Sequence, residues 1–319
     1  MTTTDRRSFL QASLGGLAGL ASVPLLTELS GCQQLPSRET AQTPASALSN
    51  AKLTERVTVI SGAPGNVIAL SSSDGVVLVD SGSSALAKAV RATLAGAGVH
   101  TLIDTHYHAD QTGGNALYGA AGTSIHSHLV TRQWLATDYY VPAEDHWVKA
   151  LPAVALPTKT FREKSELKAG VESIECGYLL EAHTRGDIYV FFRDSNVLAV
   201  GDVASPLRDP SFDWYAGGWI GGRVDALDDL LKLANEETRI VPAYGPVMTR
   251  AQLQAERDMM RHLYDRTTEL TDHGRSAQDM LDEGVLNEVN RKFQDPYRFL
   301  YDVSKGLWAH YTNFGGNIV

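Results

Sequence analysis

Residues 105–110, which read THYHAD, place three side chains that can bind a metal at alternate positions. Alternate side chains of an extended chain point to the same side, and the largely apolar run 99–103 just before them reads as a buried strand. His106, His108 and Asp110 are therefore predicted to project together from the carboxyl end of this strand. Gly113 and Gly114 then permit a tight turn and a close approach of the backbone to a bound group. This pattern predicts a fold in which the carboxyl end of a strand forms part of a metal site.

Polar residues also follow four other apolar segments, at the point where each segment ends. They are Asp80 after 76–79, His183 just after 179–180, Asp202 after 197–201, and Tyr244 after 239–243. In sheet proteins the carboxyl ends of the strands form an edge at which binding sites are commonly built. We therefore expect these residues to meet the 105–110 segment at one edge of a sheet.

The order and chemistry of these motifs resemble the metallo-β-lactamase fold superfamily, and in particular its glyoxalase II-like metallo-hydrolases. That family carries DxG, THxHxDH, GHTxGD, a later GD and a final GHG, and the resemblance runs from about Thr54 to Met248. It implies an α/β (α+β) fold, an αββα sandwich with the site at one sheet edge, here followed by a C-terminal helical extension. It also implies that a first metal ion is held by the set His106, His108, His183 and Asp202.

The chain departs from the family pattern at two positions on the same side of the site. Gln111 replaces the last histidine of HxHxDH, and Tyr244 replaces the histidine of GHG. A neutral amide and a protonated phenol are poorer ligands for a zinc-like ion than imidazole. We therefore predict one ion per chain, with zinc favoured and iron or manganese as alternatives, beside a weak or empty second site. A second site for a harder ion, formed by Asp110, Gln111 and Tyr244, stays open.

The resemblance implies a metal-dependent hydrolase that acts on a small ester, thioester, lactone or amide. A bound zinc-class ion lowers the pKa of its water to about 7 and polarises a carbonyl. Asp110 is expected to orient this water and to pass its proton to the leaving group. Tyr244 is expected to stay protonated and to donate to the developing oxyanion, although it could also serve only in packing. The alternatives are a mononuclear iron oxidoreductase that uses dioxygen, and a non-catalytic metal-binding envelope lipoprotein.

The first residues resemble an export signal rather than part of the fold. Residues 1–31 contain the pair Arg6 and Arg7, which resembles a twin-arginine signal with Gln11 where lysine is common. Residues 29–32 resemble a lipobox. The resemblance implies a lipidated Cys32 that anchors the mature protein in the cell envelope or periplasm, with the outer membrane favoured because aspartate does not follow this cysteine. Residues 32–52 are interpreted as a tether and 53–319 as the folded domain, with a helical C-terminal part from 250.

The net charge and the cysteine content of the chain limit which substrates and disulfides are expected. The formal net charge of -9 argues against nucleic acid as a substrate, since nucleic-acid binding needs a basic surface. With Cys32 lipidated, Cys176 is left alone, and no disulfide within the chain is available. A small molecule is therefore the expected substrate. The sequence does not indicate an oligomeric state.

The rest of the pattern predicts a β-rich half followed by helix, twice over. Strands are predicted at 57–60, 67–70 and 76–79 and a hairpin at 188–200, while helices are predicted at 86–94, at 227–234 and from about 250 to 311. In the last segment Leu253, Met260, Leu263 and Leu270 form a stripe that is expected to be core.

Two further groups of residues are left with weaker assignments. The aromatic group Phe212, Trp214, Tyr215 and Trp219 is expected either to line an apolar pocket or to act as a hydrophobic plug. His128 matches a family position that is not a usual ligand. No motif supports the other histidines, which are expected to be surface or satisfied core residues: His100, His126, His146, His262, His273 and His310.

Overall fold

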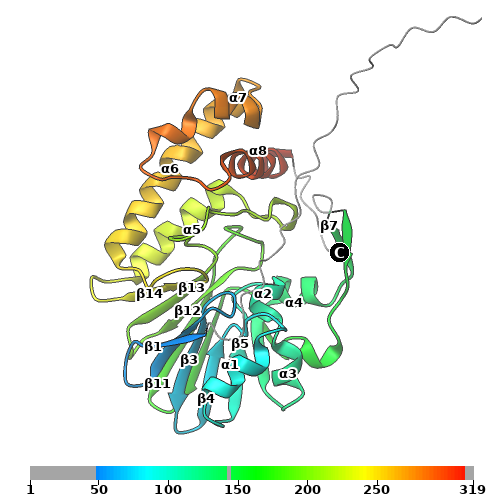
Figure 1. Ribbon diagram of the computed structural model, residues 1–319, viewed down its shortest axis with the longest axis vertical. Helices are drawn as coiled ribbons and strands as arrows, with labels where there is room; N and C mark the ends of the chain where they lie inside the picture. The colour runs from blue at the N-terminus through cyan, green and yellow to red at the C-terminus, as the bar shows by residue number, and fades with distance from the viewer. Residues whose placement is uncertain (1–47, 142–144, 313–319) are drawn as a thin grey trace, which may run out of the picture. The chain divides into compact units, whose positions relative to one another are not determined.

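Two β-sheets lie face to face between two layers of helices, as Figure 1 shows. The computed structural model describes residues 48–141 and 145–312, so the predicted signal segment, Cys32 and most of the predicted tether lie outside the described residues. In strand order, the first sheet contains β1 (Ser49–Lys52), β2 (Val57–Ser61), β3 (Val67–Ser72), β4 (Gly75–Val79), β5 (Val99–Ile103), β6 (Ser124–His128) and β9 (Lys159–Phe161). The second contains β10 (Lys164–Ala169), β11 (Glu172–Tyr178), β12 (Ile188–Phe192), β13 (Val197–Gly201) and β14 (Arg239–Pro242).

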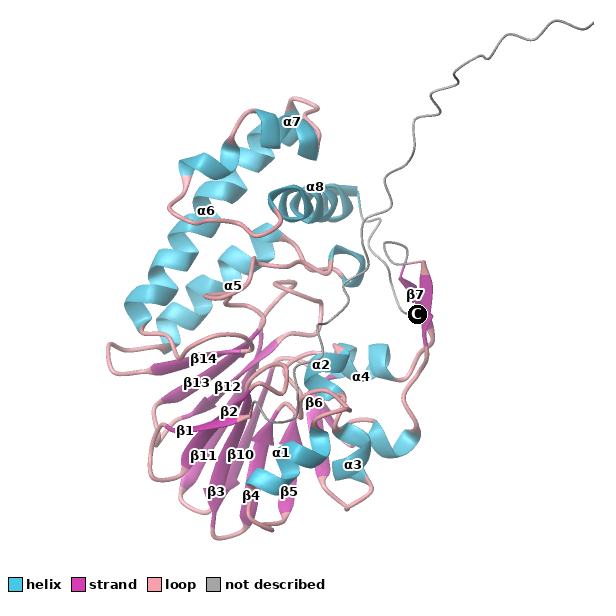
Figure 2. Ribbon diagram, in the orientation of Figure 1, coloured by secondary structure: helices cyan, strands magenta, loops and turns pink. Residues whose placement is uncertain are grey.

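Helices cover both outer faces, and a separate hairpin stands beside the first sheet (Figure 2). The helices on the side of the first sheet are α1 (Ala87–Thr93), α2 (Ala109–Thr112), α3 (Asn115–Gly119) and α4 (Leu129–Leu135). Those on the side of the second sheet are α5 (Ile220–Leu233), α6 (Arg250–Asp272), α7 (Ala277–Asp282) and α8 (Pro296–Thr312). The hairpin consists of β7 (Tyr139–Val141) and β8 (His146–Val148). The predicted αββα sandwich with a helical extension is confirmed.

Alternation along the strands explains why both faces of the first sheet are apolar. In β4, Val77 and Val79 point into the core between the sheets, where they join residues of the second sheet such as Val190. Val76 and Leu78 point the other way, into the core under α1. Because each apolar side chain is buried, each contributes about 1.5–3 kcal/mol relative to an exposed position. Strands buried on both faces therefore read as continuous apolar runs.

The C-terminal helices form the outermost core against the second sheet. The predicted stripe of α6 is buried there, from Leu253 to Leu270, so the assignment of these residues to the core is confirmed. Thr249 begins α6 with a capping box that includes Gln252. The helical region is not continuous, because Gly274 has a φ of +72° and ends α6. Helices α7 and α8 follow as separate pieces.

Two element boundaries differ from the sequence prediction. Residues 49–52, which were assigned to the tether, form strand β1 and pair with β2. Their side chains are all exposed, so an apolar pattern could not reveal an edge strand that is held by its main chain. Helix α5 begins at Ile220 rather than at 227, because glycines 221 and 222 weaken the helical signal of its first turns.

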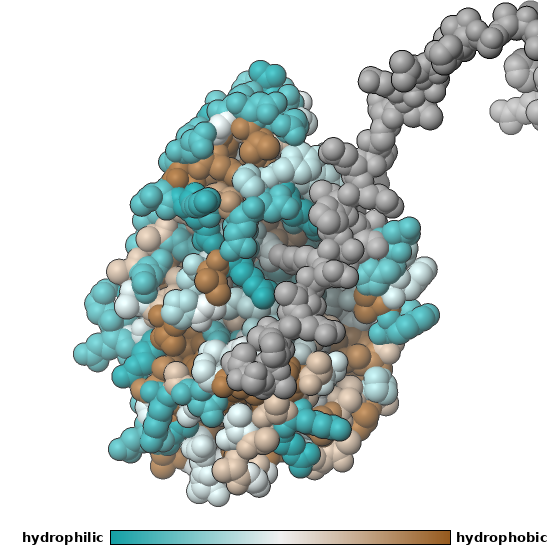
Figure 3. Space-filling model, in the orientation of Figure 1, coloured by the Kyte–Doolittle hydropathy of each residue, from teal (hydrophilic) through white to brown (hydrophobic). Residues whose placement is uncertain are grey.

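The surface is largely polar, with some apolar residues near the outer helices. Figure 3 shows a mainly hydrophilic face with apolar side chains gathered beside α6 and α7. Among residues 48–141 and 145–312, no helix combines the length and the apolar character that a membrane crossing requires.

Candidate metal centre

The loop after β5 carries two of the predicted ligands and is fixed by Asp80. The Asp80 carboxylate accepts hydrogen bonds from the Thr105 N–H at 2.8 Å and from the Thr105 hydroxyl at 2.9 Å. The expected extended run does not continue to Asp110, because β5 ends at Ile103 and residues 105–107 form a bend. Asp110 instead lies in α2, the short helix that follows. The alternation argument thus gave the correct neighbourhood but not the local backbone.

A second loop, between β11 and β12, carries His183 and is held by its own aspartate. Asp187 accepts hydrogen bonds from the backbone N–H of His183 at 2.6 Å, from the N–H of Thr184 at 2.7 Å and from the Thr184 hydroxyl at 2.7 Å. Asp202 comes directly after β13. The predicted meeting of strand ends is therefore realised, since His183 and Asp202 approach the 105–110 segment from the other sheet.

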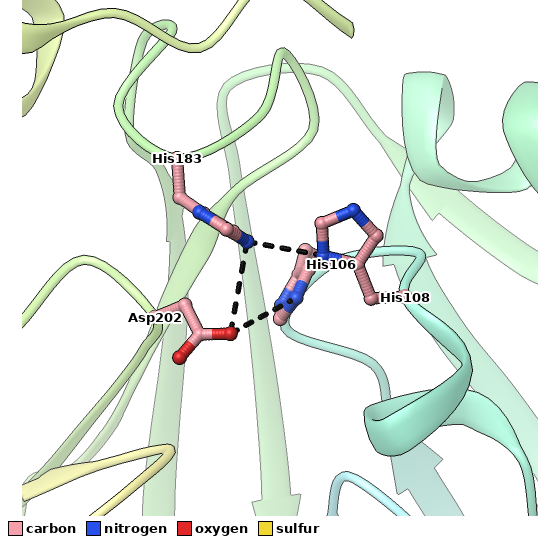
Figure 4. A group of neighbouring side chains, drawn as sticks. All are labelled: His106, His108, His183 and Asp202. Atoms are coloured by element: carbon pink, nitrogen blue, oxygen red, sulfur yellow. Dashed lines mark hydrogen bonds and ion pairs between the residues drawn. The ribbon is translucent and has the colours of Figure 1, made fainter. Parts of the chain in front are cut away.

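The four predicted ligands point toward one another, as Figure 4 shows. One ligand atom from each of His106, His108, His183 and Asp202 lies within 4.8 Å of all the others. Asp202 Oδ2 is 3.5 Å from His106 Nε2 and 3.6 Å from His183 Nε2. His183 Nε2 is 3.0 Å from His108 Nδ1. This is a closed N/O donor set that suits a zinc-class ion.

The outer nitrogens of two of these histidines are already engaged, which fixes their tautomers. His183 Nδ1 lies 2.8 Å from the Ser211 carbonyl oxygen and must donate to it. His106 Nδ1 lies 3.1 Å from the Thr105 hydroxyl oxygen, whose own proton goes to Asp80, so this histidine also donates at Nδ1. Both Nε2 atoms are then left with a free lone pair that faces the centre.

His108 is oriented by Asp213, a residue that the sequence analysis missed. His108 Nε2 lies 2.9 Å from Asp213 Oδ2, so its Nδ1 faces the centre. The Tyr107 hydroxyl donates to the same carboxylate oxygen. Burial alone would raise the pKa of Asp213, but the His108 and Tyr107 hydrogen bonds and the His108 charge hold it below its usual value. Burial would likewise lower the pKa of His108, and Asp213 outweighs burial and raises it.

The donor set passes a direct test of its fit to a metal ion. His106 Nε2 is buried and makes no hydrogen bond in the described structure. Burial, together with the charge of His108, lowers the pKa of His106 to about 3. Burial and both neighbouring histidines also hold the pKa of His183 well below its usual value. Neutral imidazole is the form that binds metals, and an orphaned buried nitrogen indicates a missing partner.

Tyr244 lines the same pocket as His108 and His183 and lies in a turn held by Asn66. The Asn66 amide donates to the carbonyl oxygens of Pro242 at 2.8 Å and Gly245 at 3.0 Å. The Tyr244 hydroxyl donates to Asp110. Burial, followed by the charges of Asp110 and Asp202, raises the pKa of Tyr244 far above its usual value, so the phenol stays protonated.

Gln111 does not line the pocket beside Tyr244. It is fully buried, and neither its amide nitrogen nor its amide oxygen has a hydrogen-bond partner. Gly65 lies over it so closely that a Cβ at this glycine would come within 3.0 Å of Gln111 Nε2. Asp110 and Tyr244 line the pocket, whereas Gln111 lies behind the pocket wall. Of the three residues considered for a second site, two are therefore engaged with each other and the third does not line the pocket.

The metal-ligand group opens into a pocket of about 430 Å³. Phe212, Trp214 and Tyr215 line it, which favours the pocket interpretation for three of the four aromatic residues. Trp219 instead stacks on His310 at 3.6 Å between ring centroids and belongs to the packing under α8. The hairpin residues Tyr139, Val141 and Val148 complete the apolar part of the wall, and charged side chains lie among the rest: Arg208, Asp209, Arg298 and Asp302.

The pocket loop 203–213 rests on helices from the C-terminal part of the chain. The Glu256 carboxylate of α6 accepts a hydrogen bond from the Ser205 N–H at 2.8 Å. The buried guanidinium of Arg223 donates to the Ser205 hydroxyl at 2.7 Å, and Arg291 donates to the Ser205 carbonyl oxygen at 2.8 Å. These contacts fix the loop that presents Arg208 to the pocket.

The remaining histidines and Cys176 lie outside the ligand set. His128 caps α4, stacks on Tyr178 and binds the Arg162 carbonyl oxygen at 2.9 Å. His146 is exposed and lines the pocket rim, a position that no motif indicated. Among the described residues, Cys176 is a buried free cysteine.

Comparison with known proteins gives the same picture as the geometry. The family model described as the metallo-beta-lactamase superfamily matches residues 60–245, a range that contains the four ligands, Asp110 and Tyr244. A metallo-beta-lactamase type 2 from Bacillus cereus is 24% identical over 203 residues, which are 62% of this chain and 73% of that protein.

Solved structures share the fold at lower identity. A metallo-beta-lactamase from Pontibacter korlensis superposes with a TM-score of 0.56 at 17% identity, over 67% of this chain and 99% of that one. A stereoselective inverting sec-alkylsulfatase from Pseudomonas sp. superposes with a TM-score of 0.61 at 15% identity, over 85% of this chain and 51% of that one. The larger share of this chain in the second superposition means that the likeness extends beyond the range matched by the family model.

Proposed function

The chain belongs to the metallo-beta-lactamase superfamily, and from this premise we propose that it is a zinc-dependent hydrolase of a small ester, thioester, lactone or amide. The observation that carries the proposal is the convergence of three imidazole nitrogens and one carboxylate on one point beside an open pocket. A purely structural metal site would need no pocket beside it. A pocket that binds no metal would need no histidines held in fixed tautomers.

The histidines, with Asp202, are the residues that would hold the ion. When bound, a zinc-class ion supplies Lewis-acid polarisation of the substrate carbonyl and lowers the pKa of a coordinated water. Asp213 and Thr105 contribute by keeping the rings of His108 and His106 in the tautomers that leave a lone pair for the ion. We propose one ion per chain, since Gln111 does not line the pocket and the Tyr244 hydroxyl is bonded to Asp110.

Asp110 and Tyr244 would act on the substrate from the pocket wall. Asp110 would accept a proton from the attacking water and return it to the leaving group, a role that its position among the lining residues supports. Tyr244 keeps its proton and presents an O–H to the oxygen that becomes negative as the carbonyl carbon turns tetrahedral. The overall reaction adds one water across the scissile bond and releases an acid and an alcohol, thiol or amine.

Metal analysis combined with a substrate panel tests this function. The exported protein is purified, its metals are identified and counted, and aryl acetates, thioesters, lactones and anilides are offered to the zinc-loaded and chelated forms. We expect about one zinc per chain and hydrolysis that chelation abolishes and zinc restores. An inert zinc form, together with an iron form that consumes dioxygen, would favour the oxidoreductase alternative. If neither form reacts, the non-catalytic alternative holds.

We also propose that the protein is exported through a twin-arginine signal and anchored by a lipidated Cys32. The support is the sequence of residues 6–7 and 29–32. Mass spectrometry of the mature N-terminus should find a lipidated cysteine at this position, and Cys32→Ala should release the protein from membranes or leave it unprocessed. A soluble wild-type protein with an unmodified N-terminus would contradict the anchor.

A further inference from the structure

A guanidinium group lies over the ring of Tyr244 at the pocket. Arg208 Cζ is 3.4 Å from the centroid of the Tyr244 ring, and Arg208 lines the same pocket as the metal ligands. Within residues 48–141 and 145–312, no carboxylate pairs with this guanidinium. A cation held on an aromatic face keeps its N–H donors available for an anionic oxygen.

The backbone around Arg208 is held at this place from two sides. Gly245, which has a φ of +106°, approaches the loop so closely that a Cβ there would come within 3.0 Å of Leu207 Cβ and 3.1 Å of Pro206 Cγ. On the other side the Arg291 guanidinium donates to the Arg208 carbonyl oxygen. The backbone that carries the cation is therefore fixed by the fold.

The charges around the candidate metal centre indicate a chemical role for Arg208. Three carboxylates, those of Asp110, Asp202 and Asp213, line the pocket close to the histidines. A single divalent ion leaves one of their negative charges uncompensated, and that charge opposes any further negative charge on a substrate. Arg208 is the cation that faces Tyr244, on the side where Gln111 provides no metal ligand.

We propose that Arg208 is a catalytic residue that takes the role of a second cation and holds the leaving-group oxygen. As water bonds to the carbonyl carbon, the bond to the leaving oxygen breaks and its electron pair stays on that oxygen. Arg208 binds this oxygen while it is negative. The oxygen finally takes up the proton that the attacking water released. The inference rests on the proposed hydrolysis and specifies the side of the pocket at which the leaving group departs.

A leaving-group comparison tests the role in catalysis. Phenyl acetate releases a more basic oxygen than 4-nitrophenyl acetate, so it depends more on a cation. Arg208→Gln should lower kcat/KM for phenyl acetate by ~100-fold, the size of the effect when one oxyanion donor is lost. For 4-nitrophenyl acetate the loss of kcat/KM should be ~10-fold or smaller. Arg208→Lys should recover part of the loss because it keeps the charge. Equal losses for the two esters, or no loss, would overturn the proposal.

The matched control is Arg193→Gln. Arg193 also lies over an aromatic ring, 4.4 Å from the centroid of Phe191, but it does not line the pocket. This variant should leave both rates unchanged. Thermal unfolding of both glutamine variants shows whether a loss of rate reflects a loss of fold, and a folded Arg208→Gln protein with wild-type rates would refute the assignment.

A metal titration tests the second-cation role without using activity. The variant Tyr244→His offers an imidazole beside Asp110 on the side of Arg208, and zinc is titrated into its metal-free form with and without Arg208→Gln. Because two cations repel each other, removing Arg208 should tighten the second zinc by ~10-fold or more. An unchanged second affinity would overturn the charge argument. If wild-type protein hydrolyses neither ester, the proposed function fails while this titration still decides the role of Arg208.

Discussion

The two sides of the pocket are built in different ways. On the histidine side, each ligand is oriented by a neighbour: Thr105 for His106, Asp213 for His108, and the Ser211 carbonyl oxygen for His183. On the tyrosine side, Tyr244 is bonded to Asp110, Arg208 lies over its ring, and Gln111 is buried behind the wall. The first side is organised to hold an ion, and the second to present a hydrogen bond and a charge.

This difference separates a donor set that could hold one ion from a neighbouring side that carries a phenol and a guanidinium. Variants on each side of the pocket test whether the two sides act separately.

The largest effect is expected on the histidine side. His183→Ala removes a ligand from the donor set, so the metal should be lost and hydrolysis with it, and the unfolding temperature should no longer respond to zinc. Elemental analysis, turnover and thermal unfolding on one preparation measure this. His262→Ala is the matched control, because this exposed histidine pairs only with Glu288. Retained metal in His183→Ala would break the comparison.

The next effect is expected on the tyrosine side. Tyr244→Phe should keep the metal and lower turnover by ~100-fold, since one oxyanion donor is lost. Metal content and turnover are measured together. A fall in metal content instead would make Tyr244 a ligand. Unchanged turnover in the fully loaded variant would leave the tyrosine with a packing role only.

A smaller effect is expected from the partner of His108. Asp213→Asn keeps the shape of the side chain but removes the charge that orients the ring, so metal affinity should fall by about 10–100-fold while the fold persists. Competition with a chelator of known affinity measures the change. Unchanged affinity would show that the Tyr107 contact or the backbone alone positions this histidine.

The smallest effect is expected at Gln111. Gln111→Met removes a buried amide without partners and keeps its volume, so the free energy of unfolding should rise by about 1 kcal/mol. Metal content should stay near one ion. Denaturant unfolding and elemental analysis test both points. A loss of metal would mean that the amide supports the ligands after all.

The sequence predicted those parts of the site that lie in short motifs or at strand ends. His106 and His108 are two residues apart, and His183 and Asp202 each follow an apolar run, so local pattern was enough. Asp213 and Arg208 could not be found in this way. Their partners His108 and Tyr244 are remote in the sequence, and only the folded loop 203–213 brings them together.

The fold followed the same rule. Strands that are buried on both faces, such as β4 and β13, leave apolar runs that periodicity detects. Strand β1 is held by main-chain pairing and has exposed side chains, so its sequence carries no apolar pattern that predicts a strand. The breaks between α6, α7 and α8 depend on glycine conformations that a helical stripe does not reveal.

The support of the pocket loop by Glu256 and Arg291 has a consequence for how such a protein can be altered. Both residues come after the range matched by the family model, which ends at 245. The pocket loop is therefore supported from a part of the chain that contains none of the four candidate metal ligands. A chimera that exchanges residues 250–312 with those of a relative would reshape the mouth of the pocket and leave the ligands untouched. New selectivity is then most directly sought by recombining these helices rather than by changing residues beside the ion.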